Sequence, residues 1–247
     1  MVSLGALIKH YRMARRLSQF DVSTKIGWKD TSRLSKIEQG RVAKPSRPVV
    51  EKIMDALDLD EIERGEFLYA GDYVPTEEEI KKVEKEVQPF LDQWPYPAFL
   101  LDFTWRMISF NEKGAHLYDF DRKLISKIEK ERLNQLELMF DPVLVKKLFL
   151  GGMEDTSWKE WVREKIGQFK IDNHTKADEK WFQQLMKKLM KIPNFSEIWN
   201  DVHSDTFKGI IHRFSKISVS PRESYYNFIL PYFKDRRFDI VLYMPAK

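Results

Sequence analysis

At 247 residues and 43% hydrophobic content, the chain can fold as one large or two ordinary domains, and its 32% of charged residues and only 10 glycines exclude a disordered or collagen-like chain. It contains no cysteine, which excludes disulfides and thiolate chemistry and fits a reducing compartment, by default the cytoplasm. The net charge of +4 combines +8 over residues 1–48 with −4 over the remainder, as expected when one end of a protein binds a polyanion.

The N-terminal part of the chain shows the periodicity of short amphipathic helices. After a first helix, Ser18 stands as the N-cap of a second helix, which Gly27 ends. A third helix follows, and two more are predicted over residues 49–57 and 62–68. Helices this short and this closely spaced predict a compact all-α bundle over residues 1–74.

The third helix begins after Asp30 or Thr31 and closes at Gly40. Leu34 and Ile37 face inward in its pattern, so the polar residues point outward. Hydrogen-bond donors on such a face fit the major groove of DNA, although a merely solvated helix face is the plainer alternative. The predicted base-reading residues are Thr31, Ser32, Arg33 and Lys36.

Three segments in this region, LSQFDVSTKIG, SRLSKIEQGRVAKPS and VVEKIMDALDL, resemble the XRE or phage-repressor family of helix-turn-helix domains, over about residues 4–72. Ser23 departs from the family's usual alanine, and serine is small enough to fit. The resemblance implies double-stranded DNA as partner, read as a homodimer on a palindromic site. It implies base contacts for Thr31, Ser32 and Lys36, a phosphate contact for Gln19, and an internal salt bridge between Arg12 and Glu38.

Two further basic residues follow the third helix. We expect Arg41 and Lys44 to contact DNA phosphates. The stretch 51–72 carries eight acidic residues against Lys52 and Arg64, so it should lie away from the phosphates.

Residues 75–95 predict a linker helix. Thr76 is an N-cap with Glu79 three residues on, and Pro95 follows the helix. Its apolar stripe predicts either a dimer seam or docking on its own domain, and we favour docking because the helix is short. The stripe consists of Ile80, Val83, Val87 and Leu91.

Residues 96–247 predict an α+β domain. The runs AFLLDF and RMISFN read as a close pair of strands, Asn111 caps a following helix, and the middle of the chain is helical and aromatic. Three strand-like runs cover 206–219, 224–233 and 238–244, with turns at SPRES and KDRR. We therefore expect an antiparallel sheet with helices on one face.

The segments YPAFLLDFTWRMISFNEKGAHLY, NQLELMFDP and FSEIWNDV resemble the MmyB-like ligand-binding domain that follows XRE-type DNA-binding domains, over about residues 88–245. The resemblance implies a PAS-like fold and a small, often apolar ligand, a fatty acid being one such class. Phe110 departs from the family's tryptophan before the asparagine. A sheet covered by helices encloses an apolar site, and ordinary core packing is the alternative for each lining residue. The predicted lining residues are Trp105, Met107, Phe110, Tyr226, Phe228, Leu230 and Leu242.

The sequence does not predict an enzyme. The five histidines show no metal-binding spacing, and no glycine-rich phosphate loop or hydrolase elbow occurs, so we expect neither a metal nor a cofactor. No apolar run is long enough for a membrane helix. Besides a ligand-responsive regulator, two alternatives stay open: an antitoxin-like protein-interaction regulator, and a constitutive DNA-binding protein with a structural C-terminal domain.

Overall fold

The computed structural model describes residues 2–149, 151–202, 214–220 and 223–246, with backbone alone for 214–220, 223 and 224. It divides into two compact units. Unit 1 comprises Met1–Thr76 and Pro231–Phe238, and unit 2 comprises Glu77–Leu230 and Asp239–Lys247.

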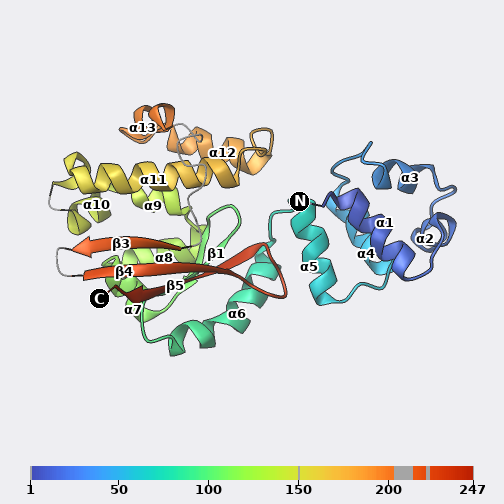
Figure 1. Cartoon of the computed structure of the whole chain (residues 1–247), viewed down its shortest axis with the longest axis horizontal. Helices are drawn as coiled ribbons and strands as arrows, with labels where there is room; N and C mark the ends of the chain where they lie inside the picture. Colours follow the sequence, from blue (N-terminus) through green and yellow to red (C-terminus); the bar gives the residue numbers. More distant parts are fainter. Residues whose placement is uncertain (1, 150, 203–213, 221–222, 247) are drawn as a thin grey trace. The chain divides into compact units, whose positions relative to one another are not determined.

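The N-terminal part of unit 1 is helical, which confirms the expected class (Figure 1). Capping explains where these helices begin. The Ser18 and Asp60 side chains each accept a hydrogen bond from the third residue of their helix, and Asp21 and Glu63 return the bond. The helices are α1 (Leu4–Ala14), α2 (Gln19–Ile26), α3 (Ser32–Glu38), α4 (Arg47–Ala56) and α5 (Glu61–Ala70).

Apolar stripes from these helices meet in one core. Each helix contributes side chains that are almost completely buried, and burial of this kind is the main force that holds so small a bundle together. Leading members of the core are Leu4, Ile8, Val22, Leu34, Ile37, Val50, Ile53, Leu57 and Phe67.

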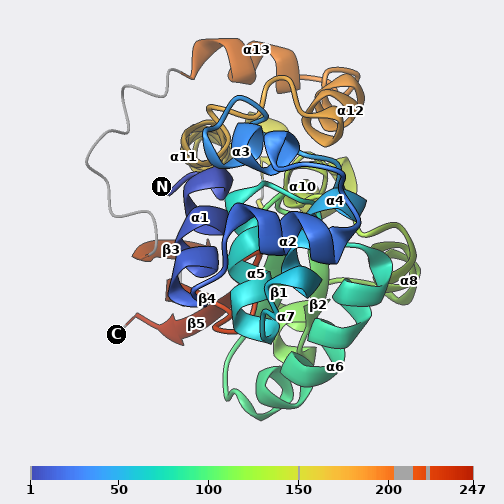
Figure 2. The same cartoon turned by 90° about the vertical axis from the view of Figure 1, so that its right-hand side faces the viewer.

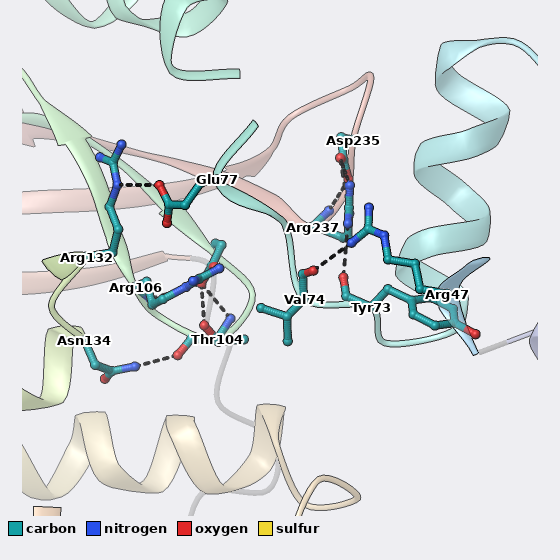
Figure 3. A network of polar contacts seen from close by, with 11 residues as sticks. Arg47, Tyr73, Val74, Glu77, Thr104, Arg106, Arg132, Asn134, Asp235 and Arg237 are labelled. Atoms are coloured by element: carbon teal, nitrogen blue, oxygen red, sulfur yellow. Dashed lines mark hydrogen bonds and ion pairs between the residues drawn. The ribbon is translucent and has the colours of Figure 1, made fainter. Parts of the chain in front are cut away.

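The segment Pro231–Phe238 is anchored in unit 1 through Arg237, whose side chain is only 1% exposed. Its guanidinium donates to both carboxylate oxygens of Asp235, with Nη2 at 2.7 Å, and its Nη1 donates to the Tyr73 carbonyl at 3.1 Å (Figure 3). At Gly65 the packing leaves no room for a side chain, because an added Cβ would lie 2.3 Å from the Lys234 carbonyl oxygen. The segment is therefore an integral part of unit 1.

Unit 2 begins with α6 (Glu77–Gln93), whose stripe residues Ile80, Val83, Val87 and Leu91 are all buried. The helix packs on the strands β1 (Ala98–Asp102) and β2 (Met107–Phe110), so its apolar stripe docks on its own unit, as expected from the sequence. The buried Arg132 adds a polar tie, since it donates to the Ile108 carbonyl at 2.7 Å and pairs with Glu84 at 2.8 Å. Arg132 also lies 3.7 Å from Glu77 (Figure 3).

The strands of unit 2 form a sheet in the order β2-β1-β5-β4-β3. The pairs β1/β2 and β3/β4 are antiparallel, with Leu100 opposite Ser109 and Lys216 opposite Tyr226. The expected α+β class with an antiparallel sheet is confirmed. The remaining strands are β3 (Phe214–Ser220), β4 (Glu223–Pro231) and β5 (Phe238–Pro245). Of the expected strand over 206–219 and the turn SPRES, residues 206–213 and 221–222 lie outside the described residues.

Helices surround this sheet. In Figure 1 those from α9 to α13 gather above it and α6 lies below it, and α11 to α13 and α6 keep these places in Figure 2. The expectation of helices on one face of the sheet is therefore wrong. The upper helices share a core with many aromatic side chains, including Trp158 and Phe195, and a second core joins the sheet to α7 and α8. The helices are α7 (Glu112–Leu117), α8 (Arg122–Glu131), α9 (Gln135–Met139), α10 (Pro142–Leu148), α11 (Thr156–Asp172), α12 (Lys180–Leu189) and α13 (Phe195–Asp201), with a 3₁₀ turn at Gly152–Glu154.

Within the described ranges, every helix is too short or too polar to cross a membrane.

The anchoring of Pro231–Phe238 predicts that substitution of Arg237 destabilises unit 1 and that substitution of the adjacent Arg236 does not. Arg237→Gln leaves the Asp235 carboxylate and the Tyr73 carbonyl without their buried donor, and we expect it to destabilise this part of unit 1 by about 2 to 4 kcal/mol. Hydrogen exchange of the amides in 61–74 measures the loss. The control is Arg236→Gln, because Arg236 is exposed. Equal exchange in the two variants would show that Arg237 anchors nothing.

Candidate nucleic-acid interface and ligand cavity

The placement of α3 depends on a buried ion pair. Arg12 of α1 donates to the Glu38 carboxylate through Nε at 2.6 Å and Nη2 at 2.8 Å, and their side chains are 11% and 2% exposed. Arg12 Nη1 also donates to the Leu17 carbonyl, and Gln19 Nε2 donates to Glu38 Oε2 at 2.8 Å. A planar guanidinium suits this two-point contact, so the pair fixes the end of α3 relative to α1 and α2.

The same contacts set the charge of Glu38. Burial alone would raise the pKa of this carboxyl, but the hydrogen bonds from Arg12 and Gln19 outweigh burial and hold the pKa below its usual value. A lowered pKa in the folded state means that the stabilisation is present at neutral pH and is lost as the pH falls through the folded value.

Close packing turns the polar face of α3 outward. Leu34 and Ile37 are buried in the core, and at Gly5 a Cβ would lie 2.2 Å from the Ile37 carbonyl oxygen, so α1 touches the backbone of α3 directly. The opposite face is the recognition face, which we define as Thr31, Ser32, Arg33 and Lys36. Ser32, Arg33 and Lys36 are exposed, and Thr31 is half-buried.

The turn before α3 holds the start of this face in place. Thr31 is the N-cap residue, yet its hydroxyl makes no capping hydrogen bond. Instead, the Asp30 carboxylate accepts from the Ser32 amide at 2.8 Å, and this bond lowers the pKa of Asp30. Arg33 lies over the Trp28 ring at 4.9 Å. Lys36 remains exposed on the next turn of the helix.

The three residues predicted to bind phosphate differ in their surroundings. Arg41 is exposed just beyond α3. Gln19 donates to Glu38, and Lys44 donates to the Asp72 carbonyl at 3.1 Å. The phosphate contacts of all three residues remain predictions. To bind a phosphate, Gln19 and Lys44 would have to share or break these internal hydrogen bonds.

In unit 2, a cavity of about 30 Å³ lies where β2 meets α9, α10 and α11. Most of its described lining residues are apolar, and those with a polar side-chain group are Gln135, Tyr118 and Trp161. Tyr118 shares a hydrogen bond of 2.8 Å with Tyr243, and burial raises the pKa of both hydroxyls, so the pair stays uncharged at neutral pH. The other lining residues are Met107, Phe120, Leu138, Met139, Leu144, Val145, Leu148 and Phe149.

The residues predicted to line a pocket are spread over unit 2. Met107 lines the cavity, whereas Trp105 packs edge-on against Phe169 and Phe110 packs against Phe99 and Phe120. The others lie on β4 and β5: Leu242 is buried, Tyr226 and Phe228 are half-buried, and Leu230 is 49% exposed.

Most of the cavity wall comes from helices, whereas most of the predicted lining residues lie on strands. The available signal was the helical stripe that contains Trp161 and the motif NQLELMFDP, which contributes Gln135, Leu138 and Met139. Strand residues alternate between two faces, so strand membership alone does not show which side a helix covers.

A second, larger pocket of about 600 Å³ has a mixed polar and apolar wall. It lies beside α7 and includes Tyr96, Lys113, His116 and Asp119. Neither this pocket nor any other part of the described ranges brings together three side chains that could hold a metal ion.

The contribution of the buried Arg12–Glu38 pair to stability can be tested by comparison with an exposed ion pair. Glu38→Gln removes the negative charge that neutralises the buried Arg12, and we expect unit 1 to lose about 2 to 4 kcal/mol of stability at pH 7. Thermal unfolding of the variant checks this. The difference in stability from the wild type should be smaller at low pH, where Glu38 of the wild type is protonated in both the folded and the unfolded state. In the control Glu51→Gln, an exposed pair with Arg47 is lost, and a change below about 0.5 kcal/mol is expected. A loss no larger than the control's would contradict the structural role of the pair.

Substitutions on and near the recognition face should affect DNA binding in two different ways. Lys36→Ala or Arg33→Ala should lower affinity for a specific duplex by about 1 to 3 kcal/mol and weaken discrimination among sequences. Arg41→Ala should weaken all duplexes alike and reduce the slope of log K against log salt by about one. Fluorescence anisotropy at several salt concentrations separates the two. A Lys36→Ala protein with unchanged sequence preference would remove Lys36 from the face that reads bases.

Comparison with known families agrees with this division of the chain. Residues 3–67 match a helix-turn-helix domain, and residues 83–226 match the MmyB-like transcription regulator ligand binding domain. Both are domains of transcription regulators and neither is catalytic. No curated protein matches the chain.

Proposed function

Because this chain belongs to the MmyB-like family of transcription regulators, with a helix-turn-helix domain before the ligand-binding domain, we propose that it is a sequence-specific regulator that binds double-stranded DNA as a homodimer in the cytoplasm. We further propose that a small apolar ligand in unit 2 modulates this binding.

The recognition face of α3 carries the DNA-binding proposal. It presents exposed donors from a short helix whose other side is fixed by the core and by the Arg12–Glu38 pair. A helix of this kind in the second position of a helix-turn-helix reads base edges, while surrounding cations contact phosphates. The charge of +8 over residues 1–48 supplies the sequence-independent attraction.

The route of the chain supports modulation by a ligand. Unit 1 includes Pro231–Phe238, and the strands β4 and β5 on either side of it belong almost entirely to the sheet of unit 2. The chain therefore passes between the units at 76/77, 230/231 and 238/239. A ligand that shifts β4 or β5 in unit 2 would displace the segment that Arg237 fixes in unit 1. This displacement would alter the distance between the two DNA-binding units of a dimer, and so the preferred half-site spacing.

Selection of duplexes from a random pool with the purified full chain tests the DNA claim. We expect the selected duplex to bind at least about a thousandfold more tightly than a scrambled one at physiological salt, because specific sites typically exceed non-specific DNA by this factor. A dimer predicts two half-sites about one helical turn apart. Weak binding that ignores sequence would overturn the proposal, and a single half-site would overturn its dimeric part.

The alternatives predict different outcomes in the same preparation. An antitoxin-like protein would purify with a protein partner. A constitutive DNA-binding protein would keep the same DNA affinity after extraction and re-addition of any small molecule that native mass spectrometry finds bound. We propose instead that removal of the bound molecule changes the affinity for the selected duplex.

A further inference from the structure

Arg33 of the recognition face lies over an aromatic ring. Its Cζ atom stands 4.9 Å from the centre of the Trp28 ring, and the residue is exposed. Within the described ranges, Arg33 forms neither an ion pair nor a hydrogen bond. Because a contact with a ring face uses no hydrogen-bond acceptor, it restrains the guanidinium and leaves the N–H donors available to a partner outside the chain.

Trp28 is itself fixed in the turn between α2 and α3. Its amide donates to the Ser23 carbonyl at 2.8 Å, and its half-buried side chain packs against the core of unit 1. Gly27 makes this turn possible, since it ends α2 in the left-handed region with a φ of 82°. The ring is therefore held in place by the fold, and it restrains Arg33 from a fixed position.

The position of Arg33 determines what its donors can reach. It lies in the first turn of α3, and residues in that part of a recognition helix contact base edges in the major groove. Guanine presents two neighbouring acceptors there, O6 and N7, which match the two-point fork of a guanidinium. Adenine presents an amino donor in place of O6. The chemistry of arginine at this position therefore favours guanine.

A long side chain that is free in solution must lose its rotamer freedom when it binds. Ordering of one such side chain weakens binding by roughly two- to twelvefold. The contact with Trp28 restricts Arg33 before DNA is bound, so part of this loss is avoided.

We infer that Trp28 positions Arg33 to donate to O6 and N7 of a guanine in the major groove. This inference rests on the proposed DNA binding, and it adds a residue outside the recognition face to those that determine sequence preference. Trp28 is a positioning residue here, and Arg33 is the residue that contacts the base.

The contact is tested first in the free full chain, by heteronuclear NMR of the arginine Nε–Hε groups. Arg33→Lys identifies the Arg33 signal by its disappearance. Because an aromatic ring changes the chemical shift of nuclei above its face, we expect Trp28→Leu to move the Arg33 signal. Trp28→Phe retains a smaller ring and should move it less. The signal of Arg41, which is exposed beyond α3, should stay in place.

The second measurement is the affinity for the selected duplex and for variants in which one guanine at a time is replaced by adenine. Fluorescence anisotropy provides the affinities. We expect one replacement to weaken wild-type binding by about fivefold to 150-fold, and Arg33→Ala to abolish the loss at that position alone. Trp28→Leu should weaken binding of the guanine duplex about fivefold and of the adenine duplex less than about twofold. Trp28→Phe should retain most of the wild-type preference.

Lys36 provides the matched control, because it belongs to the recognition face but has no aromatic contact among the described residues. In the Arg33→Ala protein, Trp28→Leu should have a further effect below about twofold, since no arginine is left to position. In the Lys36→Ala protein, its effect should remain about fivefold, as expected for residues that share no contact.

Three results would overturn the inference. These are an Arg33 signal that Trp28→Leu leaves unmoved, a loss of affinity in Trp28→Leu that is equal for guanine and adenine duplexes, and an equal loss in the Arg33→Ala protein. The last two would mean that Trp28 only supports the fold.

The test does not depend on the folding of Trp28→Leu. Lysine in Arg33→Lys keeps the charge but lacks the fork, so an unchanged guanine preference in that protein would also overturn the inference. A wild-type chain that ignores DNA sequence would refute the proposed function and the guanine contact with it. An unmoved Arg33 signal together with sequence-specific binding would overturn the role of Trp28 alone.

Discussion

The two-point contact between Arg12 and Glu38 is the constraint on which the DNA-binding unit depends. It joins α1 to the end of α3, and through Gln19 it includes the start of α2. A hydrophobic core alone is tolerant of small rotations of a seven-residue helix, whereas a buried, hydrogen-bonded ion pair has one good geometry. The direct approach of Gly5 to the backbone of α3 leaves little freedom for any other arrangement. The recognition face, which we propose to read DNA, is therefore held in one orientation.

The second unit uses a different balance of forces. Its helices and sheet are held by large aromatic cores, and Arg132 joins α6 to the sheet because it donates to Glu84 of α6 and to the Ile108 carbonyl of β2. A small cavity without a charged lining residue among those described lies between the sheet and these helices. Under the proposed ligand response, the segment around Arg237, which belongs to unit 1 and lies between β4 and β5 in the sequence, would carry such a change.

Local chemistry could be predicted from the sequence. The N-caps at Ser18 and Asn111 and the buried stripe of α6 follow from spacing and from residue type, and these features are present in the structure. What could not be predicted depends on residues far apart in the chain. The hydrogen bonds of Gln19 and Lys44, and the inclusion of Pro231–Phe238 in unit 1, depend on tertiary contacts that no local pattern records. The lining of the cavity could not be predicted either, because most of it comes from helices that meet only in the folded chain.

The central claim is that the exposed side of α3 enters the groove of DNA. Amide hydrogen exchange of the full chain, with and without the selected duplex, tests it most directly. If α3 enters the groove, exchange slows over residues 28–44, where α3 and the following basic residues lie, and stays unchanged over residues 51–63 of the acidic stretch. Protection that appears on the acidic stretch while α3 exchanges as in the free protein would show that α3 does not enter the groove.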